Sequence, residues 1–163
     1  MPISVTDEEI TALVSETKLL PNGYRGRMVT RPKRGHRERE LDVDGTNGGR
    51  FRFILRESSF NPLDFSAILA WIPPHSSTLF RLRRYNGKSH EHTNTLESQT
   101  FYDFHIHQAT ERYQSAGLRE DAFAEPTDRY ESFHGAVQCL IADCGVVFSG
   151  NDQPELFEEG DPT

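Results

Sequence analysis

Residues 50–56 read Arg-Phe-Arg-Phe-Ile-Leu-Arg, a segment in which apolar and cationic side chains alternate. Successive side chains of a β-strand point to opposite faces, so the apolar residues would face a core while Arg50, Arg52 and Arg56 line the other face. Such alternation is typical of an antiparallel sheet with one buried and one open face. The segment therefore predicts a sheet whose open face carries arginine.

Other segments complete an α+β layout. Thr6 and Glu9 form a capping box for an N-terminal helix, and residues 126–128 are expected to open a C-terminal helix. Strands are expected near residues 65–72, 78–85, 88–93 and 101–108, with Asn86-Gly87 as a two-residue hairpin turn. We predict an antiparallel sheet of about 4–6 strands with both helices packed on one face. One domain is expected over residues 1–150, followed by an acidic, disordered tail over residues 151–163.

Charge is divided unevenly along the chain, whose net charge is −7. Residues 24–90 contain 14 Lys or Arg against 6 Asp or Glu, whereas residues 91–163 contain 3 against 15. This asymmetry points to an anionic partner on one side of the molecule, unless the two halves neutralise each other in the fold. The acidic overall balance argues against a simple nucleic-acid coat protein but permits a local basic groove.

Sequence features also bear on the cellular compartment. No apolar run approaches the ~20 residues that span a bilayer, and the residues after Met1 do not form an export signal. Cys139 and Cys144 are five residues apart in a helical pattern, which points their thiols apart and argues against a disulfide. These features predict a cytoplasmic protein with reduced thiols and no membrane partner.

Two His-x-His pairs, His90/His92 and His105/His107, are the features of the sequence best suited to chemistry. Alternate residues of a strand share a face, so each pair would place two imidazoles roughly 7 Å apart along one strand. In the second pair the alternation assigns Ile106 to the core and both histidines to the open, solvent-facing side. Two such pairs on neighbouring strands would gather four titratable, metal-competent rings.

The first functional hypothesis is a toxin-like, metal-independent endoribonuclease. Transfer of a phosphate to a 2′-hydroxyl needs a base, an acid and cations on the phosphate, and imidazoles can serve as base and acid at neutral pH. The predicted catalytic residues are His90, His92, His105 and His107. The predicted substrate-binding residues are Arg52, Arg81, Arg83, Arg84, Tyr85, Lys88 and Arg112. This hypothesis needs no cofactor, and it implies RNA and an antitoxin or inhibitor protein as partners.

Two alternatives stay open. The same four histidines could bind zinc or another transition metal, because His-x-His is a common ligand spacing and imidazole suits these ions. The basic half could instead engage nucleic acid or an acidic protein surface without catalysis. In that case the histidines would be hydrogen-bonding or pH-responsive bystanders.

One further pattern combines both histidine motifs. Within residues 80–94, a strand-like segment ends in Arg and Gly and is followed by His92-Thr93-Asn94. The motif His105-Ile106-His107 comes next. This pattern resembles a family of small, uncharacterised bacterial and phage proteins with His-x-Asn and His-x-His strand motifs. Members tend to lie near mobile elements, so the resemblance implies a toxin or defence role. It leaves His90, the basic segment 24–39 and the acidic tail unmatched.

Overall fold

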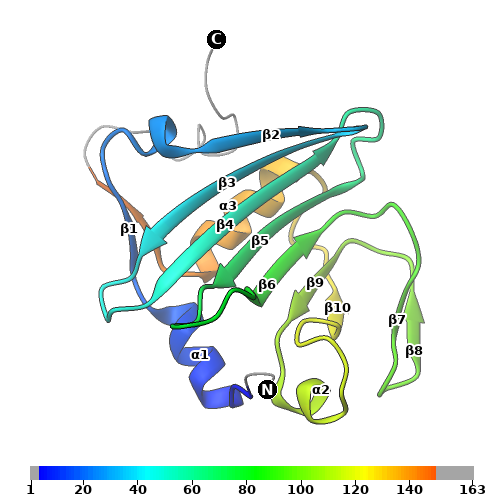
Figure 1. The fold of residues 1–163 in the computed structure, drawn as a ribbon. Coiled ribbons are helices and arrows are strands. Elements are labelled where there is room, and N and C mark those ends of the chain that lie inside the picture. Colours follow the sequence, from blue (N-terminus) through cyan, green and yellow to red (C-terminus); the bar gives the residue numbers. More distant parts are fainter. Residues whose placement is uncertain (1–3, 150–163) are drawn as a thin grey trace.

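Seven antiparallel strands form the main sheet of this α+β protein, in the order β10-β9-β6-β5-β4-β3-β2 (Figure 1). The computed structural model describes residues 4–149, so the acidic tail lies outside the described residues. The strands are β2 Val29–Lys33, β3 His36–Asp44, β4 Arg50–Ser58, β5 Phe65–Trp71, β6 Phe80–Asn86, β9 His105–Gln108 and β10 Ala124–Pro126. The fold class is confirmed, and the sheet is larger than predicted because the charged segment 29–44 supplies two strands.

Two small strand pairs and four helical segments complete the described chain. Strands β1 (Lys18–Leu20) and β11 (Val146–Phe148) pair in parallel, whereas β7 (His92–Asn94) and β8 (Gln99–Phe101) form an antiparallel hairpin. The helical segments are α1 Asp7–Ser15, the 3-10 turn η1 Tyr24–Arg27, α2 Glu111–Ser115 and α3 Phe133–Asp143. None of the described helices is long and apolar enough to cross a membrane.

The core lies between one face of the sheet and the N- and C-terminal helices, with α3 crossing behind the strands in Figure 1. Phe51, Phe53 and Leu55 of β4 are fully buried there, as their alternation predicts. Helix α1 begins at the predicted capping box, in which the Thr6 side chain accepts from the Glu9 backbone. Helix α3 begins later than predicted, at Phe133, because Ser132 rather than the 126–128 segment caps it.

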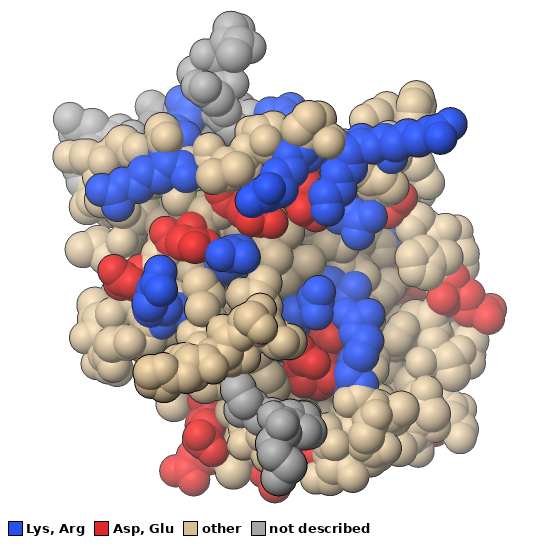
Figure 2. Space-filling model, in the orientation of Figure 1, with Lys and Arg blue, Asp and Glu red and all other residues tan. Residues whose placement is uncertain are grey.

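The opposite face of the sheet is open and carries the predicted arginines. Figure 2 shows Lys and Arg gathered on this face, with Asp and Glu between them. Several of these cations are paired across strands, as in Arg52–Asp42 at 2.6 Å, Lys33–Glu38 at 3.2 Å and Arg31–Glu40 at 3.5 Å. Part of the basic charge is therefore neutralised within the sheet itself.

The predicted hairpin at Asn86-Gly87 is wrong. Asn86 ends β6 with partners on both sides, and the next two amides donate to the carbonyls of Phe65 and Leu63. A Cβ on Gly87 would lie 1.9 Å from the Leu63 carbonyl oxygen, so glycine is needed for close approach rather than for a turn. The chain therefore leaves the sheet before β7, and β7 pairs with β8 instead of returning along β6.

A β-bulge in β6 places two of the predicted substrate-binding residues, Arg81 and Arg83, on opposite faces of the sheet. Arg81 pairs with Ala70 on the open face, but the register then shifts and Arg83 pairs with the buried Leu69. Because the bulge inserts one residue, Arg83 turns toward α3, where its Nη1 lies 3.9 Å from Asp143. Arg83 therefore lies on the core side of the sheet, away from the histidines with which it was grouped as a predicted substrate-binding residue.

Candidate metal centre

Three histidines from two elements meet beside the β9–β10 end of the sheet. His92 comes from β7, and His105 and His107 come from β9, where Ile106 between them points into the core. One nitrogen of each ring lies within 4.8 Å of one nitrogen of both other rings, an arrangement that could hold a metal ion. The His92 ring is stacked on His105, with centroids 5.2 Å apart, and meets His107 edge-on at 4.9 Å.

The histidine face of β9 is buried, which corrects the expectation that it faces solvent. The exposed fraction is 2% for His105 and 4% for His107. The β7–β8 hairpin contributes to this burial, because His92 and Phe101 both pack against the His105 ring. Alternation correctly separated both rings from Ile106, but it carried no information about the hairpin.

Each ring has one nitrogen engaged by an oxygen. The Nδ1 of His105 lies 2.8 Å from the Asp103 carbonyl oxygen, and the Nδ1 of His107 lies 2.7 Å from that of Asp121. A carbonyl oxygen only accepts hydrogen bonds, so each Nδ1 carries the hydrogen. In a neutral ring the Nε2 then keeps a free lone pair, which is the form that binds a metal.

Asn94 fixes the third ring. Its Nδ2 donates to the Ala124 carbonyl and to Gln99 Oε1, and its Oδ1 accepts from the Ala124 amide. The His92 Nε2, 2.8 Å from the same Oδ1, must therefore be a donor. His92 in its neutral form thus offers Nδ1, and fully buried Asn94 ties β7 to the sheet edge at β10.

The surroundings favour the neutral form of the two β9 rings, His105 and His107. Burial, with a smaller contribution from the positive charge of Arg84, lowers the pKa of His107 from 6.5 to about 2. Burial also lowers the pKa of His105 to about 4, partly offset by its bond to the Asp103 carbonyl. Neither ring is protonated at neutral pH, so both are ready to bind a cation but poorly suited to donate a proton.

A buried ion pair stands next to the rings. Arg84 is the cross-strand partner of His107, and its Nε lies 3.3 Å from a carboxylate oxygen of Asp121. Asp121 is fully buried and also pairs with Arg119 at 3.2 Å. The same residue therefore supports His107 through its carbonyl and Arg84 through its carboxylate.

The other predicted site residues are distributed over the molecule. His90 is exposed and lies outside the group of three, with its Nδ1 near Ser89. Tyr85 is buried on the α3 side, where its hydroxyl donates to Asp143. Lys88 lies over the Tyr102 ring, 5.8 Å from its centroid.

Arginines of the predicted substrate-binding set separate in the same way. Arg112 of α2 donates to Glu97. Arg52 lies on β4, two strands away from β6 in the sheet, and pairs with Asp42 of β3. Arg84 lies beside the histidines, and Arg81 is close enough to contribute to the potential at Arg84. The structure therefore brings together His92, His105, His107 and Arg84, whereas Arg81 is shown to be near Arg84 alone.

Two residues that complete the centre, Asn94 and Asp121, were not among the predicted site residues. The His-x-Asn spacing was a signal for Asn94, because residues i and i+2 of a strand share a face. No sequence signal identifies Asp121, which reaches His107 across fourteen residues through its backbone. Neither a family model, nor a curated protein, nor a solved structure matches the chain.

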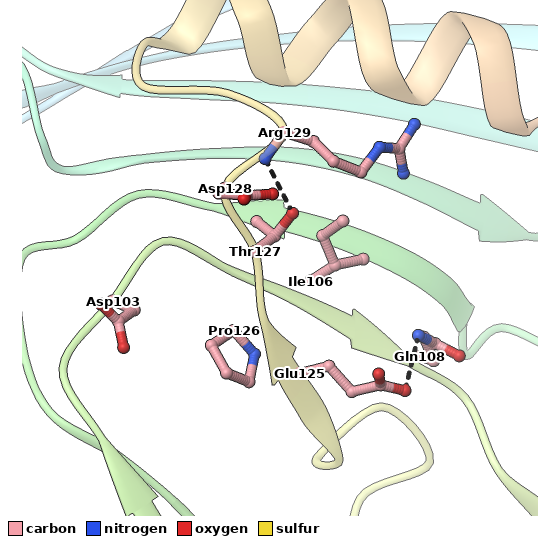
Figure 3. A pocket seen from close by; sticks show the side chains of 8 residues that line it. All are labelled: Asp103, Ile106, Gln108, Glu125, Pro126, Thr127, Asp128 and Arg129. Carbon is pink, nitrogen blue, oxygen red and sulfur yellow. Dashed lines mark hydrogen bonds between the residues drawn. The ribbon is translucent and has the colours of Figure 1, made fainter.

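A second pocket beside β9 is not part of this centre. It has a volume of about 640 Å³ and lies along β9 and β10, where Figure 3 shows its lining residues. Three of its polar side chains already have partners: Gln108 donates to Glu125, and Arg129 points toward α3 and pairs with Asp143. None of the three histidines lines it.

Proposed function

We propose that this protein binds one transition-metal ion, with zinc as the first candidate, through His92, His105 and His107. The observation that carries the proposal is the hydrogen bonding of all three rings to acceptor oxygens, which leaves one lone pair on each neutral ring. Metal-binding histidines are commonly oriented in this way by carbonyl or amide oxygens. Three protein ligands also leave a position for water or substrate, which is the arrangement of catalytic zinc sites.

Metal binding requires a contraction of the site. Zinc–nitrogen bonds of about 2.0–2.1 Å place tetrahedral ligand nitrogens about 3.4 Å apart. The nitrogens now lie within 4.8 Å of one another. His92 can supply this movement, because it belongs to a three-residue strand of a separate hairpin rather than to the main sheet.

RNA cleavage with the histidines as acid and base stays a prediction, as do RNA and antitoxin binding and a cytoplasmic location. The geometry favours the metal over this mechanism for a specific reason. Acid–base cleavage needs a ring that can donate a proton near neutral pH, and burial lowers the pKa of both β9 histidines far below that range. RNA cleavage that persists in excess EDTA and is lost in His107→Gln would favour the acid–base mechanism.

Elemental analysis and calorimetry test the metal proposal. Protein purified without a His tag is stripped with a chelator, dialysed and titrated with Zn²⁺. We expect one site, lost or weakened at least about a hundredfold in His105→Gln and His107→Gln, because each removes one of three ligands. His90→Gln is the matched control, since His90 is exposed and outside the group. Equal weakening in His90→Gln, or no binding by the wild type, would contradict the proposal.

A further inference from the structure

A smaller polar pocket opens on the face of the sheet beside the histidine centre. Its volume is about 270 Å³, and its lining includes Arg56, Ser66, Arg84, Asn86, Ser89 and His90. These residues supply guanidinium, hydroxyl, amide and imidazole groups, and guanidinium is a donor only. Arg56 and Arg84 therefore offer only donors to a ligand, while Asp64 adds a carboxylate to the same lining.

Strand register places this pocket directly next to the candidate metal centre. Asn86 is the cross-strand partner of His105, and Arg84 is the partner of His107. Paired residues of neighbouring strands share a face, so Asn86 and Arg84 of the pocket lie beside His105 and His107 of the centre. A ligand held in the pocket would have its far end close to the three rings.

Positive charge exceeds negative charge in and next to the pocket. Within residues 4–149, Arg56 forms no ion pair or side-chain hydrogen bond, and the buried Nε of Arg84 has no hydrogen-bond partner. Asp121 is shared between Arg84 and Arg119. Asp64, a carboxylate in the lining, lies 3.6 Å from the His36 ring. The guanidiniums of Arg56, Arg84 and Arg119 therefore outnumber the carboxylates of Asp64 and Asp121, and Arg56 is the one of the three without a counter-ion among the described residues.

We propose that this pocket binds a phosphoryl group and that the protein takes phosphate esters as its ligands. A phosphoryl group matches the lining better than a carboxylate, because it offers three acceptor oxygens and up to two negative charges to the guanidiniums of Arg56 and Arg84. The volume suits one phosphoryl group with part of its ester. The idea that the bound ester lies next to a metal ion rests on the proposed function. The binding of the phosphoryl group itself does not.

Two arginines of β4 provide a matched test. Arg56 and Arg52 lie four residues apart on the same open face, but Arg52 is paired with Asp42 and lies outside the pocket. Metal-free protein is titrated with inorganic phosphate, a 5′-mononucleotide and a dinucleoside monophosphate, and the titrations are repeated with one equivalent of Zn²⁺. We expect one site, weakened about tenfold by Arg56→Gln and unchanged by Arg52→Gln.

The results separate this inference from the proposed function. A preference for the mononucleotide identifies monoesters as the ligands, and a preference for the dinucleoside monophosphate identifies diesters. No binding of any probe in either form of the protein, or equal weakening by both substitutions, would overturn the phosphoryl site. Zinc binding is measured separately on the same variants. Phosphate binding without zinc binding would refute the metal centre and leave the phosphoryl site standing.

Discussion

His107 and Asp121 are joined by a buried hydrogen bond of 2.7 Å from the ring Nδ1 to the backbone carbonyl oxygen. The bond fixes the tautomer of His107, while the Asp121 carboxylate balances the charge of Arg84 on the neighbouring strand. Orientation of the ring and neutralisation of the arginine thus depend on different atoms of one residue. Substitutions can separate the two effects, because a side-chain change leaves the carbonyl in place.

We expect Asp121→Ala to lower the free energy of unfolding by about 3 kcal/mol, because it leaves the largely buried Arg84 without its counter-ion. The double variant Asp121→Leu/Arg84→Met should lose less stability than the sum of the losses in the single variants Asp121→Leu and Arg84→Met, since no unpaired buried charge remains. Denaturant unfolding of the four proteins measures this coupling. Strict additivity would show that the ion pair does not link the two residues.

Asn94→Ala should weaken zinc binding by about 10–100-fold, because the amide that orients His92 is lost. Stability should fall by about 2 kcal/mol, since the buried amide and carbonyl of Ala124 lose their partner. Thr93→Ala is the control: Thr93 is exposed, and its hydroxyl contacts Thr100. Zinc titration compares the affinities of the two variants. Equal affinities would show that Asn94 does not orient a metal ligand.

Substitution of Gly87 tests the corrected path of the chain. Both Gly87→Ala and Gly87→Asn should destabilise the protein by about 3 kcal/mol or more, because a Cβ would collide with the Leu63 carbonyl. An Asn at this position would be tolerated in an exposed type I′ turn, so its measured effect discriminates between the two conformations. Gly26→Ala, where a Cβ meets no atom within 4 Å, should be nearly neutral.

A buried lysine makes stability depend on pH. Lys18 is fully buried, its Nζ donates to the carbonyls of Leu13, Val14 and Glu16, and burial lowers its pKa from 10.5 to about 8. Between these two values the unfolded chain binds more protons than the folded chain, so Lys18 makes the free energy of unfolding rise with pH.

Unfolding measured from pH 8 to 10.5 should show this rise in the wild type and lose the Lys18 contribution in Lys18→Met. The slope is compared rather than the absolute stability, because the substitution also removes three hydrogen bonds. Lys33→Met, which removes an exposed lysine paired with Glu38, should keep the wild-type slope. An identical slope in Lys18→Met would show that this lysine does not titrate in the buried state.

The periodicity of apolar residues and the capping motif correctly predicted the elements whose conformation depends on residues close together in the chain. The alternation in β4 predicted its buried face, the capping box predicted the start of α1, and Ile106 was correctly separated from both histidines of β9. The α+β class followed from these elements. Each of them is determined by residues that are close together in the chain.

The errors arose where distant contacts decide the conformation. A glycine required by the Leu63 carbonyl looks the same in sequence as a glycine required by a turn, so Gly87 suggested a hairpin. The bulge opposite Leu69 and Ala70 has no local signal, and it turned Arg83 away from the histidines. Asp121 contacts His107 only in the folded chain. The sequence therefore predicted the three histidines of the centre but not the residue that orients His107.

The most direct test of the metal centre is a long-range ¹H–¹⁵N NMR spectrum of the histidine rings in untagged wild-type protein, recorded during a Zn²⁺ titration. Without metal, we predict hydrogen on Nδ1 of His105 and His107 and on Nε2 of His92. One equivalent of Zn²⁺ should shift the opposite nitrogen of these three rings together and leave His36, His75, His90 and His134 unchanged. Unchanged signals for the three rings, or shifts centred on His90, would contradict the account.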